Sequence, residues 1–124
     1  MIIWLASYPK SGNTWLRSLI ANYYFSETGD FNFELLEKID SFPSNKYFRK
    51  YLDKFNQPHD TSKYWIKEQE KINQSEGLKF FKTHNALCKI EGNQFTNKEN
   101  TLGVIYIIRD PRNVISSLSN HYQI

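Results

Sequence analysis

The sequence predicts an α/β fold in which a parallel sheet is flanked by helices, and three short apolar runs support this prediction. They occupy residues 1–6 (MIIWLA), 78–82 (LKFFK) and 102–108 (LGVIYII) and suit buried strands better than helices. Helical patterns separate them, as in parallel sheets built with crossovers. Ligands of such sheets bind beyond the carboxyl ends of the strands, so the polar residues after each run form the candidate site.

The length and composition fit one domain. A chain of 124 residues with 40% apolar and 16% aromatic content can bury one hydrophobic core but hardly two. We expect a single domain over residues 1–124, with a helical insertion over about residues 31–76. The 16 Lys and Arg and 13 Asp and Glu residues are scattered, so no nucleic-acid surface is expected.

Two further helices flank the expected strands. From Thr14 to Tyr24 the apolar positions recur at helical spacing, with Asn13 or Thr14 able to cap the start and ETGD marking the end. After the third strand, RNVISSLSNHY predicts a last helix. The first strand therefore leads through a short loop into a helix, and the third strand does the same.

One cysteine and the start of the chain bear on the cellular compartment. Cys88 has no partner for an internal disulfide and no zinc-ligand spacing around it, and we expect it to be a small core residue in a reducing compartment. The start of the chain has no signal-peptide pattern, and no apolar run approaches the roughly 18 residues of a membrane span. We expect a cytoplasmic protein without a membrane span.

The residues after the first strand, SYPKSGNTW, predict an anion-binding loop. The first backbone N–H groups of a helix have no intrahelical partners, and the helix dipole adds positive potential there. Gly12 lets the backbone approach a ligand closely, and Lys10 adds a full charge. The N–H groups of residues 11–14 are therefore suited to a phosphate or sulfate group.

The residues after the other two strands add groups suited to proton transfer and phosphate binding. In KTHNA, His84 is a candidate general base, and Lys82 points to the same side of an extended segment. In RDPRNVISSLS, the planar fork of Arg109 matches phosphate oxygens, and Ser117 adds a neutral donor. Trp15, beside the first loop, is either a platform for a purine ring or a core residue.

In their order along the chain, these three clusters resemble the cytosolic-type sulfotransferase family. Its members carry a YPKSG-T-W loop, a K-T/S-H segment, and an R-D-P/R-N segment followed by a helix with a spaced serine; the resemblance runs from Ser7 to Ser117. It implies a three-layer, P-loop NTPase-like α/β architecture. It also implies transfer of a sulfuryl group from 3′-phosphoadenosine 5′-phosphosulfate, without a metal, to a hydroxyl or amine of a small-molecule, glycan or lipid acceptor.

The resemblance further implies a role for each matching residue. The catalytic residues would be Lys10 at the bridging oxygen, Lys82 at a sulfuryl oxygen and His84 as the base. The donor nucleotide would be bound by Lys10, Ser11, Gly12, Asn13, Thr14, Trp15, Arg109 and Ser117. Asn13 stands where threonine is usual in the family. His59 and His121 are interpreted as ordinary histidines, because neither follows a strand end with a matching partner.

Two alternatives stay open. A P-loop nucleoside-triphosphate enzyme shares the strand–loop–helix geometry, but its G-x-x-x-x-G-K-[ST] pattern is absent, because Lys10 precedes Gly12. A noncatalytic nucleotide-binding fragment is the other alternative. Family members continue with a Gly-rich segment that covers the nucleotide, and we expect this 124-residue form to be a truncated one that lacks it. We expect the apolar surface left uncovered to favour self-association.

Overall fold

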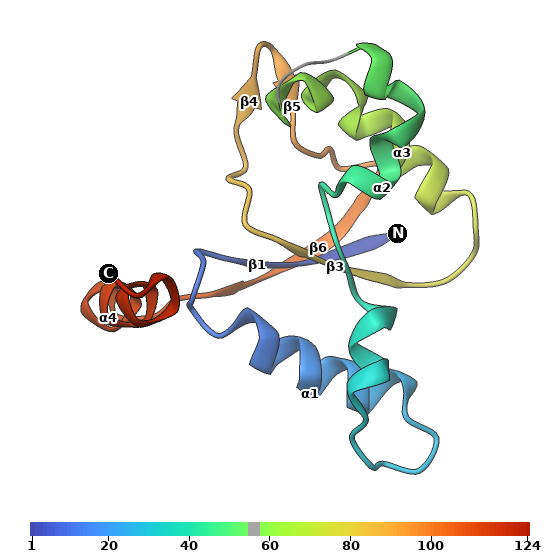
Figure 1. Cartoon of the computed structure of the whole chain (residues 1–124). Coiled ribbons are helices and arrows are strands. Elements are labelled where there is room, and N and C mark those ends of the chain that lie inside the picture. Colours follow the sequence, from blue (N-terminus) through green and yellow to red (C-terminus); the bar gives the residue numbers. More distant parts are fainter. Residues whose placement is uncertain (55–57) are drawn as a thin grey trace.

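The computed structural model describes residues 1–54 and 58–124, and their central element is a four-stranded parallel sheet (Figure 1). The strand order is β2–β3–β1–β6. The strands are β1 (Ile2–Ser7), β2 (Asp40–Ser41), β3 (Lys79–Thr83) and β6 (Thr101–Ile107). All pairings are parallel, so the carboxyl ends of β1, β3 and β6 lie at one edge of the sheet.

Helices cover both faces of this sheet (Figure 1). On one face lie α1 (Asn13–Phe25) and the 3₁₀ helix η1 (Phe33–Lys38). On the other face lie α2 (Asn45–Phe48), η2 (Arg49–Lys54), η3 (Pro58–Tyr64) and α3 (Trp65–Asn73). The last helix, α4 (Pro111–Tyr122), extends from the end of β6. The predicted α/β class, with a parallel sheet flanked by helices, is confirmed.

Each face of the sheet has its own apolar core, because successive side chains of a strand point to opposite faces. Trp4 is buried in an aromatic cluster with residues that include Phe42, Phe81 and Phe95. Leu5, the next residue, is buried on the opposite face in a cluster with Ala21, Ile39 and Phe80. Strand β1 therefore packs against the helical layers on both faces of the sheet.

The three predicted strands are present, and each is displaced by a single residue from its predicted limits. Strand β2 and the hairpin of β4 (Lys89–Ile90) with β5 (Asn93–Gln94) were not predicted, because two-residue strands leave no periodic pattern. The start of α1 also differs from the prediction. Gly12 is the N-cap, and the Asn13 side chain makes no capping bond.

The outer edge of the sheet at β6 is apolar and open. The side chains of Leu102, Val104 and Tyr106 are exposed, although the sequence predicted a buried central strand. No strand pairs with this edge within the described part of the chain. Cys88 is exposed as well, so its expected place in the core is wrong. The side chain of His59 lies outside the described residues.

None of the described helices is long and apolar enough to cross a lipid bilayer.

Candidate functional site

A polar pocket of about 560 Å³ opens at the carboxyl ends of β1, β3 and β6. Its walls come from the loop before α1, from the segment after β3, and from the β6–α4 turn with α4 itself. The lining residues are Pro9, Lys10, Gly12, Asn13, Thr14, Lys82, His84, Arg109, Ser117, Leu118, His121 and Tyr122. The parallel register thus brings together three clusters that are far apart in the sequence.

The loop between β1 and α1 presents backbone donors to this pocket. Lys10 (φ 63°) and Gly12 (φ 104°) both have positive φ, which turns the chain tightly before the helix. A Cβ added at Gly12 would meet nothing within 4 Å, so the backbone conformation alone favours glycine there. The first turn of α1 has no acidic residue and no side-chain cap. Its leading N–H groups are therefore available to an anion.

The side chain of Asn13 does not point toward a ligand. It is 5% exposed, and its amide Nδ2 donates to the Leu5 carbonyl at 2.9 Å and to Ser7 Oγ at 3.1 Å. A carbonyl oxygen only accepts, so Nδ2 must be the atom that faces Leu5. Asn13 thus ties the start of α1 to the end of β1, and only its backbone N–H remains for an anion.

His84 lies on the pocket wall with its ring held by the end of β1. The distance from Nδ1 is 2.7 Å to the Ser7 carbonyl oxygen and 3.4 Å to Ser7 Oγ. Because the carbonyl accepts, Nδ1 carries the hydrogen, and Nε2 is the unprotonated nitrogen of the neutral ring. His84 also lines a smaller pocket of about 130 Å³ with the Ser41–Phe42–Pro43 segment, so it stands where two cavities adjoin.

Lys82 belongs to both cavities as well, and it is partly buried. Burial, reinforced by the positive charge of Arg17, lowers the pKa of its ammonium group. Arg17 is fixed by bonds from Nη2 to the carbonyl oxygens of Leu36 and Ile39, at 2.9 and 2.6 Å. An anion in the pocket would offset the repulsion between these two cations, so the electrostatics favour a negatively charged ligand.

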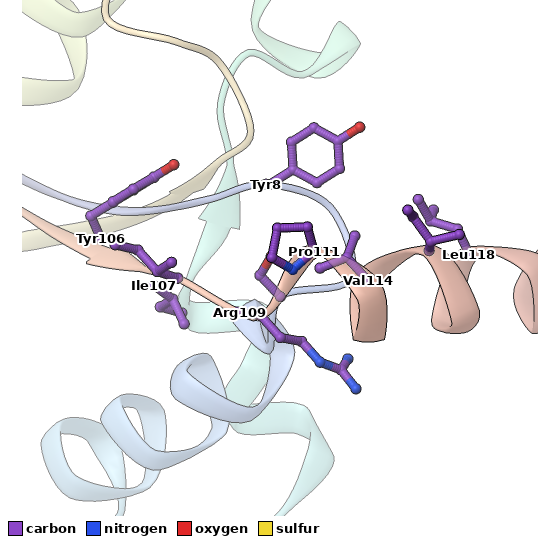
Figure 2. A pocket seen from close by; sticks show the side chains of 10 residues that line it. Tyr8, Tyr106, Ile107, Arg109, Pro111, Val114 and Leu118 are labelled. Carbon is purple, nitrogen blue, oxygen red and sulfur yellow. The ribbon is translucent and has the colours of Figure 1, made fainter.

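Arg109 ties the third strand to the first loop. Its Nη1 donates to the Lys10 carbonyl oxygen at 2.8 Å, which leaves its other donors available. Figure 2 shows the guanidinium extending away from the apolar side chains of Tyr106, Val114 and Leu118. Ser117 lies near the middle of α4 and lines the same pocket.

His121 is a pocket residue that the sequence analysis set aside. It follows Ser117 by four positions on α4, so both lie on one face of the helix. Both line the polar pocket, together with Tyr122. Helical spacing from Ser117 is the sequence signal for this placement.

Two predicted nucleotide-binding residues lie away from this pocket. The Trp15 side chain is 69% exposed on α1 and does not line the pocket, so its interpretation as a core residue is wrong. Stacking of adenine on Trp15 stays a prediction. Ser11 is buried and lines a neighbouring apolar pocket of about 420 Å³, shown in Figure 2 with Tyr8 and Tyr106. The Ser11 backbone still belongs to the loop before α1.

Within the described ranges, no group of three or more His, Cys, Asp and Glu side chains is arranged to hold a metal ion. The pocket is instead rich in cations and backbone donors, since Lys10, Lys82 and Arg109 line it beside the N-terminus of α1. Such an environment suits phosphate and sulfate groups.

A parallel α/β sheet with an uncapped helix N-terminus and converging cations defines a protein class that binds phosphorylated or sulfated ligands. Comparison with family models narrows this class, because the model described as a sulfotransferase domain matches residues 2–124. The chain belongs to the sulfotransferase family, as the sequence motifs predicted. Searches of curated proteins and of solved structures found no match.

Proposed function

We propose that the protein transfers the sulfuryl group of 3′-phosphoadenosine 5′-phosphosulfate to a hydroxyl or amine of an acceptor. The observation that carries this proposal is the shared polar pocket of Lys10, Lys82, His84, Arg109 and Ser117, in a chain of the sulfotransferase family. The donor is a co-substrate, and its charge matches the cations that surround the pocket.

The donor's phosphosulfate end belongs at the loop before α1. The N–H groups of residues 11–14 can surround its oxygens, and the positive end of the helix dipole favours the negative charge. Arg109 and Ser117 lie across the pocket, on the segment after β6, and would hold the 3′-phosphate. The four free donors of the Arg109 guanidinium suffice for this contact alongside its bond to Lys10.

In the transfer step, the acceptor's oxygen or nitrogen forms a bond to sulfur while the bond from sulfur to the bridging phosphate oxygen breaks. Lys10 neutralises the charge that develops on that oxygen, and Lys82 holds a sulfuryl oxygen. His84 takes the acceptor's proton on Nε2, because its Nδ1 already carries a hydrogen bonded to Ser7. The products are the sulfated acceptor and adenosine 3′,5′-bisphosphate.

The acceptor would reach His84 from the smaller pocket beside it. That pocket is bounded by the Ser41–Phe42–Pro43 segment, and it shares Lys82 and His84 with the larger one. A small-molecule acceptor placed there has its nucleophile next to the imidazole and next to the sulfur held by Lys82. A cytoplasmic location is part of the proposal and is supported by the resemblance to the cytosolic-type members.

The proposal is tested by incubating the protein with donor labelled in its sulfuryl group and with phenol, sugar, lipid and amine acceptors. We expect labelled acceptor and an equal amount of adenosine 3′,5′-bisphosphate, at the same rate in Mg²⁺ and in EDTA. The variant His84→Gln should lose about 10²- to 10⁴-fold in turnover. Binding of the nucleotide without any transfer would favour a noncatalytic module, and a strict Mg²⁺ requirement with ATP would favour a nucleoside-triphosphate enzyme.

A further inference from the structure

The side chains of Asn13 and His84 are connected by hydrogen bonds through Ser7, whose side chain and backbone carbonyl both take part. The Asn13 amide donates to Leu5 and Ser7, and the Ser7 carbonyl oxygen accepts from His84 Nδ1. Ser7 and Asn13 are 3% and 5% exposed, so water does not compete freely for the two Asn13 bonds. His84 itself is exposed, and its bond to Ser7 is partly buried. The start of α1 is thereby linked, through the last residue of β1, to the imidazole that follows β3.

We propose that Asn13 is a positioning residue for His84. By fixing the end of β1, its amide keeps the Ser7 carbonyl oxygen where it can hold the imidazole as the Nδ1–H tautomer. Nε2 is then the unprotonated nitrogen. This inference rests on the proposed function, because His84 acts as a base only if an acceptor gives up a proton in this pocket.

The register of the sheet explains why Ser7 and His84 meet. Ala6 pairs with Thr83, so Ser7, the last residue of β1, lies at the same level as His84, the first residue after β3. Ser7 also pairs with Ile107 of β6, and the chain turns into the loop directly after it. The two bonds from Asn13 Nδ2, one on each side of Ala6, restrain this last stretch of β1.

The opposite end of the Asn13 amide favours a positioning role over a purely structural one. Its Oδ1 is buried, and within the described structure it has no hydrogen-bond partner. A buried acceptor without a partner costs free energy, so asparagine is not the residue that stability alone would favour at this position. What asparagine supplies is a pair of hydrogens on one nitrogen, and both are used.

During transfer this connection also supports the charged ring. When His84 takes the acceptor's proton on Nε2, the ring becomes a cation whose Nδ1–H still donates to the Ser7 carbonyl oxygen. A carbonyl fixed in advance stabilises that charge without rearranging. A ring free to adopt the other tautomer has a hydrogen on Nε2 and cannot accept the proton there.

The tautomer is measured directly from long-range ¹H–¹⁵N correlations of the histidine rings in the ligand-free protein. His84→Gln assigns the His84 signals. In the wild type we expect Nδ1 of the neutral His84 ring to be protonated and Nε2 unprotonated. His121 is the matched control, because it lines the same pocket but makes no hydrogen bond to a carbonyl within the described structure. Its ring should show the Nε2–H form that predominates in water.

Two variants then test Asn13 itself. Asn13→Asp keeps the shape but has no donor for the Leu5 carbonyl, and Asn13→Ala removes the group. In both we expect a mixture of His84 tautomers and a loss of about 10- to 100-fold in kcat. KM for the nucleotide should stay nearly unchanged in Asn13→Ala, whereas the new carboxylate of Asn13→Asp should raise it by repelling the anionic donor. Ser7→Ala keeps the backbone carbonyl of residue 7 and the bond from Asn13 to the Leu5 carbonyl. The His84 tautomer should therefore stay as in the wild type, and kcat should fall less than in the Asn13 variants.

Separate outcomes overturn the two proposals. A wild-type His84 protonated on Nε2, or a tautomer and kcat that are unchanged in Asn13→Asp, overturns the role of Asn13 and leaves the transfer reaction standing. If Asn13 controls the tautomer as expected but no acceptor is sulfated, the proposed reaction is overturned, and Asn13 loses its catalytic role with it. Should the Asn13 variants fail to fold, a wild-type His84 protonated on Nε2 would still overturn the role of Asn13.

Discussion

Two strand–loop–helix turns meet at the pocket, and their helix starts are built in opposite ways. The turn from β1 into α1 has a glycine N-cap with positive φ, no side-chain cap and no acidic residue. The turn from β6 into α4 is capped by Asp110, whose Oδ1 accepts from the Arg112 backbone N–H at 2.9 Å, and Pro111 follows directly. The start of α1 is therefore open to an anion, whereas the start of α4 is occupied by the carboxylate of Asp110.

This difference assigns separate tasks to the two turns. An uncapped helix start binds an anion through its backbone, so α1 would hold the group that reacts. At α4 the carboxylate of Asp110 takes the place of an external anion, and that turn would contribute to binding through the side chains of Arg109 and Ser117, which line the pocket. The bond from Arg109 to the Lys10 carbonyl oxygen fixes the two turns to each other.

Replacing Lys10 should have the largest effect if the first turn holds the reacting group. We expect Lys10→Ala to reduce turnover by about 10²- to 10³-fold, because a preorganised cation next to a developing negative charge is removed. Lys89→Ala is the control, since Lys89 is exposed on the distant strand β4. The measurement is the steady-state turnover rate of sulfuryl transfer. Equal turnover rates for Lys10→Ala and Lys89→Ala would contradict the role of the first turn.

Arg109 tests the side-chain contribution of the second turn. Arg109→Ala should weaken the binding of adenosine 3′,5′-bisphosphate by about 1.5–3 kcal/mol, the range for a charge-assisted hydrogen bond. It should barely affect the binding of adenosine 5′-monophosphate. Arg112→Ala should change neither affinity, because Arg112 pairs with Asp110 and does not line the pocket. Equal losses for both nucleotides in Arg109→Ala would mean that the arginine acts only by holding Lys10.

Gly12 tests the backbone of the first turn. Gly12→Ala should cost about 1–2 kcal/mol in nucleotide affinity or stability, because a residue with a Cβ disfavours its φ of 104°. Gly29→Ala is the matched control, with φ 84° in the turn after α1 and away from the pocket. The melting temperature should fall in both variants. Nucleotide affinity, measured by titration, should fall only in Gly12→Ala.

Asp110 should have the smallest effect on binding. Asp110→Ala removes the cap of α4, so the melting temperature should fall while nucleotide affinity stays close to that of the wild type. Hydrogen bonds from Arg112 lower the pKa of this carboxyl group. The stabilisation is therefore present above the pKa of the unfolded chain, and it is lost as pH falls through the lower folded-state pKa. Thermal melts across acidic pH would show this difference between wild type and variant.

The sequence was sufficient to predict the features that local patterns determine. The three longer strands, the loop before α1 and the meeting of three clusters follow from apolar runs and from the geometry of parallel sheets. The exposure of Trp15 did not follow, because helical spacing cannot say which face of α1 a neighbouring layer covers. Strand β2 was missed because two residues carry no pattern.

The internal contacts of the site depend on register, which the sequence pattern left open. Ser7 meets His84 only because Ala6 pairs with Thr83, and a shift by one residue would separate them. The inward turn of the Asn13 side chain depends in turn on Gly12 being the N-cap. His121 reaches the pocket because it lies one helical turn after Ser117 on α4.

The central claim is that the two turns together recognise a nucleotide with a 3′-phosphate. Isothermal titration of the protein with adenosine 3′,5′-bisphosphate, adenosine 5′-monophosphate and ATP tests this claim most directly. We expect clear preference for the bisphosphate, in EDTA as well as in Mg²⁺, and a preference that weakens in Arg109→Ala. Equal affinity for the bisphosphate and the monophosphate, or tighter Mg²⁺-dependent binding of ATP, would contradict it.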